Sequence, residues 1–263
     1  MGQSVRRFAW DEAAGLWTVT SFDSASASER AYRARRIVSS APMRDVVNSV
    51  SPRPASAAAA ATLKYRDFLT VALFLKSKAH FDDNWIYIHD PSVKVGRVQN
   101  YASWSPAMVP AADKGCLGLE YFCFEGDGLW TMGDDDLVRL ATSELTKLCL
   151  VEPGQVTGGH VVRQQKAYPV YDDGYQAAVD AVKEEFAIRF PTFHFVGRNG
   201  MHKYNNQDHA MMTAMLTVRN IAAGPAVYDV WRVNEDAEYH EEVTSRDGEA
   251  AGGLRTVPQA HKS

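Results

Sequence analysis

The sequence of 263 residues contains little cysteine and no long apolar run. Its three cysteines, Cys116, Cys123 and Cys149, have neither an even count nor zinc-ligand spacing, which indicates reduced thiols in a cytoplasmic protein. The longest apolar run, 68–75, is too short to cross a bilayer, and the chain does not open with the charged and apolar segments of a signal peptide. A net charge of −4 and the lack of a basic run argue against a nucleic-acid surface.

Several motifs of enzyme chemistry are also missing. No Gly-x-Gly-x-x-Gly stands between a predicted strand and helix, where it would seat the pyrophosphate of a dinucleotide. No Gly-x-Ser-x-Gly elbow or Cys–His pair predicts covalent hydrolysis. His202 and His209 lie seven residues apart without a third ligand, so we expect no metal site.

The pattern of apolar residues predicts a mixed α+β protein. Apolar or alternating runs predict strands at 5–10 and 16–22, which we expect to form a hairpin around the turn residues 11–15. Further strands are predicted at 32–42, 68–75, 85–89, 93–101, 117–124, 160–168 and 193–196. Helices are expected at 43–50, at 55–63, from Asp134, at 175–190 and from about Gln207. Successive strands without intervening helices favour a mixed or antiparallel sheet in the middle of the chain.

The segment 193–222 carries the most informative pattern. A short apolar run, 193–196, predicts a buried strand, and Gly197 and Arg198 follow it directly. Asn205, Asn206 and Asp208 are residue types that begin helices. The following apolar positions recur at helical spacing: Met211, Met215, Val218 and Ile221. Because a helix start presents free N–H groups and a partial positive charge, the connection from this strand to this helix suits an anionic or electron-rich ligand.

The residue order from Gly197 to Asp208 resembles the C-terminal flavin motif of UDP-galactopyranose mutase and the wider amine-oxidase-like FAD flavoproteins. That motif reads roughly Gly-Arg, four residues, Lys/Arg-Tyr, one residue, Asp-Met-Asp. The matching residues are Gly197, Arg198, Lys203, Tyr204 and Asp208, whereas Asn206 replaces the usual acid and Gln207 the methionine. The resemblance implies that FAD is the cofactor and that the helix start lies near the pyrimidine edge of the flavin. The implied cofactor-binding residues are Gly197, Arg198, Asn205, Asn206, Gln207 and Asp208.

The resemblance implies an FAD-dependent oxidoreductase that moves hydride from a small-molecule substrate, such as an amine, to the flavin. A mutase acting on a sugar nucleotide without net redox change is the alternative. In the mutases an acid stands at the position of Asn206, and an aromatic residue usually precedes the position of Lys203, where this chain has Met201-His202. Because these departures weaken the match to the mutases, we rank the oxidoreductase first. We expect Arg97, Tyr168 and Tyr204 to bind substrate, since cations on strands and loops of a net-acidic protein suit an anionic ligand. No catalytic residue is assigned.

The resemblance also implies a domain organisation. In the family a glycine-rich dinucleotide motif begins the chain, so this sequence is expected to be a C-terminal portion that lacks it. The expected parts are a partial FAD-binding domain at 1–50, a substrate domain at 51–165 and a return to the FAD domain at 166–222. A tail at 223–263 is expected to be partly disordered. A third interpretation is therefore a non-catalytic fragment that needs a partner, either an N-terminal half or a second copy.

Overall fold

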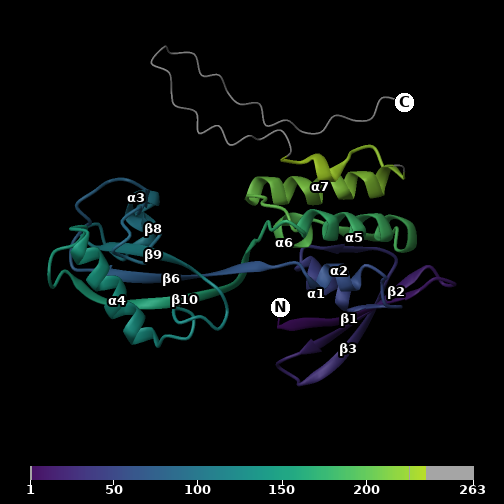
Figure 1. The fold of residues 1–263 in the computed structure, drawn as a ribbon, viewed down its shortest axis with the longest axis horizontal. Helices are drawn as coiled ribbons and strands as arrows, with labels where there is room; N and C mark the ends of the chain where they lie inside the picture. The colour runs from purple at the N-terminus through teal and green to yellow at the C-terminus, as the bar shows by residue number, and fades with distance from the viewer. Residues whose placement is uncertain (1, 225, 235–263) are drawn as a thin grey trace, which may run out of the picture. The chain divides into compact units, whose positions relative to one another are not determined.

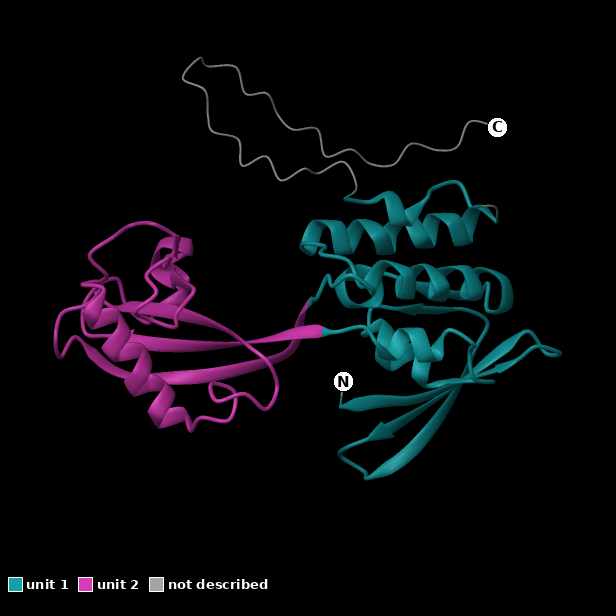
Figure 2. Ribbon diagram, viewed as in Figure 1, with its two compact units in different colours: residues 1–64, 169–263 teal, residues 65–168 magenta. Residues whose placement is uncertain are grey.

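The computed structural model of the protein describes residues 2–224 and 226–234. The chain divides into two compact units, one formed by 1–64 with 169–263 and the other by 65–168 (Figure 2). Residues 51–64 therefore belong to the first unit, whereas the resemblance implies a substrate domain that begins at residue 51. Most of the tail at 223–263, for which partial disorder is predicted, lies outside the described residues.

A β-meander forms the N-terminal part of unit 1 (Figure 1). Strands β1 (Gln3–Asp11) and β2 (Leu16–Asp23) pair antiparallel across a turn at 12–15, which confirms the predicted hairpin. Strand β3 (Ser28–Ala34) pairs with β2, and β5 (Val50–Ser51) pairs parallel to β1. The single strand predicted at 32–42 is wrong, because the chain leaves the meander after Ala34 and begins β4 (Ile37–Ser39) in another sheet.

That other sheet has two parallel strands, β4 and β11 (Phe193–Phe195), which are far apart in the chain. Helix α5 (Tyr175–Arg189) packs its buried Val182 and Phe186 into the core of this unit. The Trp17 ring of β2 contacts the ring of Phe193 in the same core, at 5.3 Å between centroids. The shorter helices α1 (Met43–Asn48) and α2 (Ala57–Ala61) contribute further buried side chains. The apolar stripe predicted for 175–190 thus faces the core.

Unit 2 is built on a five-stranded sheet of order β10-β6-β9-β8-β7. Its strands are β6 (Tyr65–Leu75), β7 (Trp85–Tyr87), β8 (Arg97–Asn100), β9 (Gly115–Cys123) and β10 (Val156–Pro169). The pairs β6–β9, β8–β9 and β7–β8 are antiparallel. Helix α4 (Asp134–Lys147) packs against this sheet through Leu137, Ala141 and Leu145. The mixed α+β class with an antiparallel middle sheet is confirmed.

The last part of unit 1 is helical. Strand β11 leads into the short helix α6 (Gly197–Gly200) and then into α7 (Gln207–Ala223), and η2 (Val230–Arg232) follows. The apolar stripe of α7 is exposed: Met211 is 64% exposed, Met215 48% and Val218 56%. Within the described residues, no helix combines the length and apolar character that a membrane span requires.

Candidate functional site

The connection from β11 to α7 depends on two glycines that lie against the turn after β4. Gly197 has a φ of +76°, a conformation that side chains disfavour, and its N–H donates to Thr213 Oγ1 of α7 at 2.9 Å. A Cβ on Gly200 would lie 2.6 Å from the Ser39 carbonyl oxygen and 3.1 Å from Ser40 Cα. The backbone of α6 therefore touches the backbone of that turn, and no side chain fits between them.

Arg198 binds the loop that it begins. Its Nε donates to the Asn205 carbonyl oxygen at 2.8 Å, and a terminal nitrogen donates to Asn206 Oδ1 at 3.4 Å. Its guanidinium carbon lies 4.8 Å from the centre of the Tyr204 ring. These contacts close residues 198–206 into one loop, so Arg198 fixes the position of the helix start.

Asn205 lies at the centre of this loop and is 1% exposed. Its side-chain N–H donates to the Gly197 carbonyl oxygen at 3.3 Å. Its Oδ1 is buried and accepts no hydrogen bond from the residues that the structure describes. Since buried acceptors are normally satisfied, this oxygen marks a place where a bound group can complete the hydrogen bonding.

The start of α7 is capped locally and lies beside a cavity. Asn206 donates its backbone N–H to His209 Nδ1 at 3.3 Å, and the His209 N–H donates to Asp208 Oδ1 at 2.9 Å. The cavity measures about 410 Å³, and its lining includes Asn206, His209 and the stacked rings of Tyr171 and Tyr175. The predicted helix start therefore lies at the edge of an open cavity.

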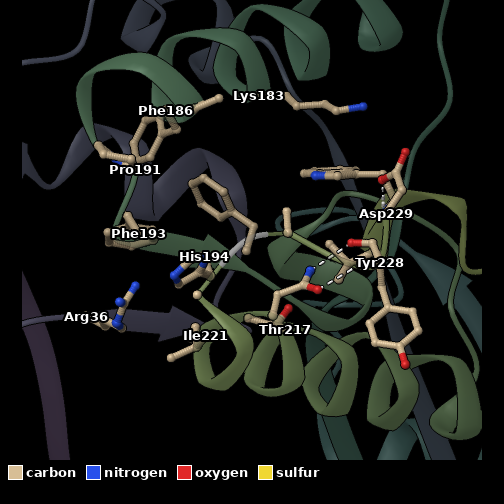
Figure 3. A pocket seen from close by; sticks show the side chains of 17 residues that line it. Arg36, Lys183, Phe186, Pro191, Phe193, His194, Thr217, Ile221, Tyr228 and Asp229 are labelled. Atoms are coloured by element: carbon tan, nitrogen blue, oxygen red, sulfur yellow. Dashed lines mark hydrogen bonds between the residues drawn. The ribbon is translucent and has the colours of Figure 1, made fainter. Parts of the chain in front are cut away.

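A second cavity, of about 520 Å³, lies along α5, β11 and the later part of α7 (Figure 3). His194 and Thr217 line it, and burial together with the charge of Arg36 lowers the pKa of His194. None of the predicted site residues contributes to this cavity.

The predicted substrate residues divide between the two units. Arg97 and Tyr168 meet in unit 2, where a terminal nitrogen of Arg97 donates to the Tyr168 hydroxyl oxygen at 3.0 Å. Tyr204 belongs to the α6–α7 loop of unit 1. Arg97 Nε also pairs with the buried Glu120 carboxylate at 2.5 Å. The ion pair offsets the charge of Arg97 locally, and the binding of substrate by Arg97, Tyr168 and Tyr204 stays a prediction.

Sequence reasoning missed the partners of Arg97. Trp85 and Phe122 place their ring centres 4.7 and 4.8 Å from the guanidinium carbon, and Glu120 neutralises it. Alternation within 117–124 places Glu120 and Phe122 on one face of the sheet, which was the available signal. For metals, no cluster of three or more His, Cys, Asp or Glu side chains suitable for an ion occurs in the described part of the chain.

Comparison with known proteins identifies the fold. No protein-family model matches the chain, and no curated protein matches it by sequence. Solved structures of FAD-dependent amine-oxidase-like flavoproteins do match, so the chain has the fold of part of such a flavoprotein.

Among these structures is a reduced UDP-galactopyranose mutase, with a TM-score of 0.70 and 16% identity over 84% of this chain and 46% of that one. A putrescine oxidase bound to putrescine matches with a TM-score of 0.54 and 14% identity, over 84% of this chain and 48% of that one. A fatty acid isomerase from P. acnes matches with a TM-score of 0.56 and 10% identity, over 82% and 47%. The chain therefore spans about half the length of these proteins, and at such identities the likeness concerns the fold.

Proposed function

We propose that this chain supplies the flavin-facing part of an FAD-dependent oxidoreductase resembling the amine oxidases. The proposed cofactor-binding residues are Gly197, Arg198, Asn205, Asn206, Gln207 and Asp208. The observation that carries the proposal is the connection from β11 through Gly197 to the start of α7. This connection lies within a fold that the chain shares with flavoproteins over 84% of its length.

Two features of the loop fit a bound flavin. Gly197 has a positive φ and no side chain where β11 ends, and a bare backbone is what close approach to a planar cofactor requires. The unsatisfied Asn205 Oδ1 offers an acceptor in the same loop. The start of α7 contributes a positive field worth about 1 kcal/mol toward electron-rich oxygens of the ring.

In this proposal Arg198 is a positioning residue. Its hydrogen bonds to Asn205 and Asn206 hold the loop that presents the helix start. FAD, when bound, supplies the hydride-accepting chemistry, and the chain supplies orientation and electrostatics.

The exposed stripe of α7 supports the need for a further protein segment. Met211, Met215 and Val218 form an apolar face that is largely exposed in the described part of the chain. Such faces mark interaction sites. We propose that a segment carrying a dinucleotide-binding motif, from the same polypeptide or a partner, covers this face and binds the adenine-nucleotide part of FAD.

The absorption spectrum tests cofactor binding. Purified protein incubated with FAD and desalted is expected to retain the flavin bands in the blue and near ultraviolet. Arg198→Ala is expected to lower retention, because the loop loses the two hydrogen bonds that fix it. Arg139→Ala, which removes an exposed arginine from α4, is the matched control and is expected to retain flavin normally. Equal retention in both variants would contradict the assignment of Arg198.

A mutase acting on a sugar nucleotide is the second candidate. Its support is the TM-score of 0.70 with UDP-galactopyranose mutase, against 0.54 with putrescine oxidase. Dithionite-reduced protein that converts UDP-galactopyranose would favour the mutase, whereas oxygen consumption with amines would favour the oxidoreductase. Activity in neither assay, together with no flavin retention, would favour the non-catalytic interpretation.

A further inference from the structure

One face of the sheet in unit 2 is left uncovered by α4. Leu117, Leu119 and Tyr121 of β9 belong to the buried cluster that includes the α4 side chains. Because side chains alternate along a strand, Glu120 and Phe122 point to the opposite face. We call this opposite face, around Arg97 and Glu120, the aromatic face.

Strand register places the members of the aromatic face in rows. Tyr87 pairs with Arg97, and Arg97 pairs with Glu120. In the next row Trp85 pairs with Gln99. Phe122 pairs with Phe68 on the other side of Glu120. Polar groups thus occupy the middle of the face and aromatic rings surround them.

The polar groups in the middle bond to one another. Arg97 pairs with Glu120 through Nε at 2.5 Å and donates to the Tyr168 hydroxyl at 3.0 Å. The Gln99 side-chain amide donates to the other oxygen of Glu120. Both charged groups are buried, at 9% and 2% exposure. The middle of the face is therefore electrically neutral. Within the described residues, Arg97 Nε and Glu120 Oε2 meet as an ion pair without forming a hydrogen bond.

The rings around this network are accessible. Trp85 and Tyr87 stack with their planes 8° apart and their centres 6.2 Å apart, and Trp104 of α3 (Tyr101–Trp104) meets Trp85 edge-on. All three rings are exposed, whereas Arg97 is buried and its guanidinium lies against the rings of Trp85 and Phe122. Exposed rings held above a planar, paired guanidinium favour stacking contacts over charge recognition.

We propose that the aromatic face binds the uncharged aromatic ring of a small-molecule ligand and discriminates against anions. Stacking on Trp85 and Tyr87 supplies the attraction, while the neutral Arg97–Glu120 pair offers no free charge to a carboxylate or phosphate. The proposal uses unit 2 alone, so its failure leaves the flavin proposal intact.

A pair of ligands that differ in charge tests this selectivity. 2-Naphthamide and 2-naphthoate carry the same ring, and saturation-transfer difference NMR titrations measure their binding to the full chain. The wild-type protein is expected to bind the amide about tenfold more tightly than the carboxylate, and inorganic phosphate is expected not to compete. Comparable binding of the two naphthalenes would overturn the proposal.

Two exposed tyrosines on strands provide a matched pair of variants. Tyr87→Ala is expected to weaken amide binding about fivefold, because one stacking ring is lost. Tyr32→Ala removes a similarly exposed ring from β3 in unit 1 and is expected to leave binding unchanged. Equal losses in the two variants would show non-specific adsorption and overturn the assignment.

Glu120→Gln separates recognition from a purely structural role. The change leaves the Arg97 charge unneutralised, so 2-naphthoate is expected to gain affinity relative to the amide. An unchanged ratio of the two affinities in a folded variant would contradict the role of the ion pair.

Sedimentation of the wild-type protein tests whether a second copy of the chain covers the aromatic face instead of a small molecule. A dimer that Tyr87→Ala dissociates, with no binding of naphthamide, would assign the face to a second copy instead.

Discussion

Helices α5 and α7 of unit 1 have similar apolar periodicity in the sequence but opposite fates in the structure. The α5 stripe, which includes Val182 and Phe186, lies in the core. The α7 stripe of Met211, Met215 and Val218 is exposed, while Thr213, Leu216 and Thr217 are the buried residues of that helix. Periodicity therefore identifies a helix and its apolar face, but it does not say whether the chain itself supplies the surface that covers that face.

The largest expected effect comes from placing a charge on the buried stripe. Val182→Asp buries an unpaired carboxylate and is expected to cost about 4 kcal/mol or more of unfolding free energy. Met215→Asp makes the same kind of change on α7 and is expected to stay within about 0.5 kcal/mol, because the site is exposed. Urea unfolding monitored by circular dichroism measures both. Similar losses in the two variants would show that the α7 stripe is covered after all.

A smaller loss is expected where the chain passes from β11 to α7. Gly200→Ala forces a Cβ against the Ser39 carbonyl oxygen and is expected to cost about 1–3 kcal/mol. Gly128→Ala is the control, because a Cβ there meets no atom within 4 Å and the residue does not have a positive φ. A Gly200→Ala variant as stable as the control would indicate that the two backbones do not touch.

The polar side of α5 gives a pH-dependent effect. Glu185 accepts N–H groups from Ala55 at 2.9 Å and Ser56 at 2.7 Å, and despite opposing desolvation these hydrogen bonds lower its pKa from 4.5 to about 2. A lowered folded-state pKa stabilises the protein above pH 4.5, and this contribution disappears as pH falls toward 2.

Glu185→Gln is therefore expected to lower the free energy of unfolding by about 1–2 kcal/mol at pH 7. Below pH 4 the difference from the wild type is expected to shrink, because the wild type loses the same contribution. Thermal unfolding across this pH range measures the difference. A destabilisation that does not change with pH would contradict the charged hydrogen bonds.

The smallest expected change in stability comes from making the α7 stripe polar. This change tests directly whether that stripe differs from the buried stripe of α5. Met211→Gln combined with Met215→Gln is expected to change unfolding free energy by less than about 0.5 kcal/mol. The same variant should bind less of a hydrophobic dye and associate less, as light scattering can show. Unchanged dye binding would mean that the stripe is not the accessible apolar surface.

The sequence predicts the parts of the molecule whose pattern depends on local physics. The hairpin of β1 and β2, the buried stripe of α5 and the helix beginning near Gln207 all follow from periodicity and turn chemistry. The separation of β3 from β4 could not be predicted, because it depends on a parallel pairing of β4 with β11, 156 residues further along the chain.

The sequence predicts site residues less completely than the fold. The motif from Gly197 to Asp208 marks the loop, but the role of Arg198 within that loop depends on the contacts that its side chain makes in three dimensions. The sequence marks Arg97 by its charge, whereas Glu120, 23 residues away, offsets that charge across the β8–β9 pair. Strand register decides such pairings, and the register of two strands joined by a long connection cannot be read from the local pattern of a single sequence.

The most direct test of the flavin proposal uses riboflavin, which carries the isoalloxazine ring without the adenine nucleotide. Its fluorescence is measured while wild-type protein is added. If the loop 197–206 and the start of α7 face the ring, quenching should saturate, and Asn205→Ala should weaken the binding. Quenching that does not saturate, or that is the same in Asn205→Ala, would contradict the placement of the flavin at this loop.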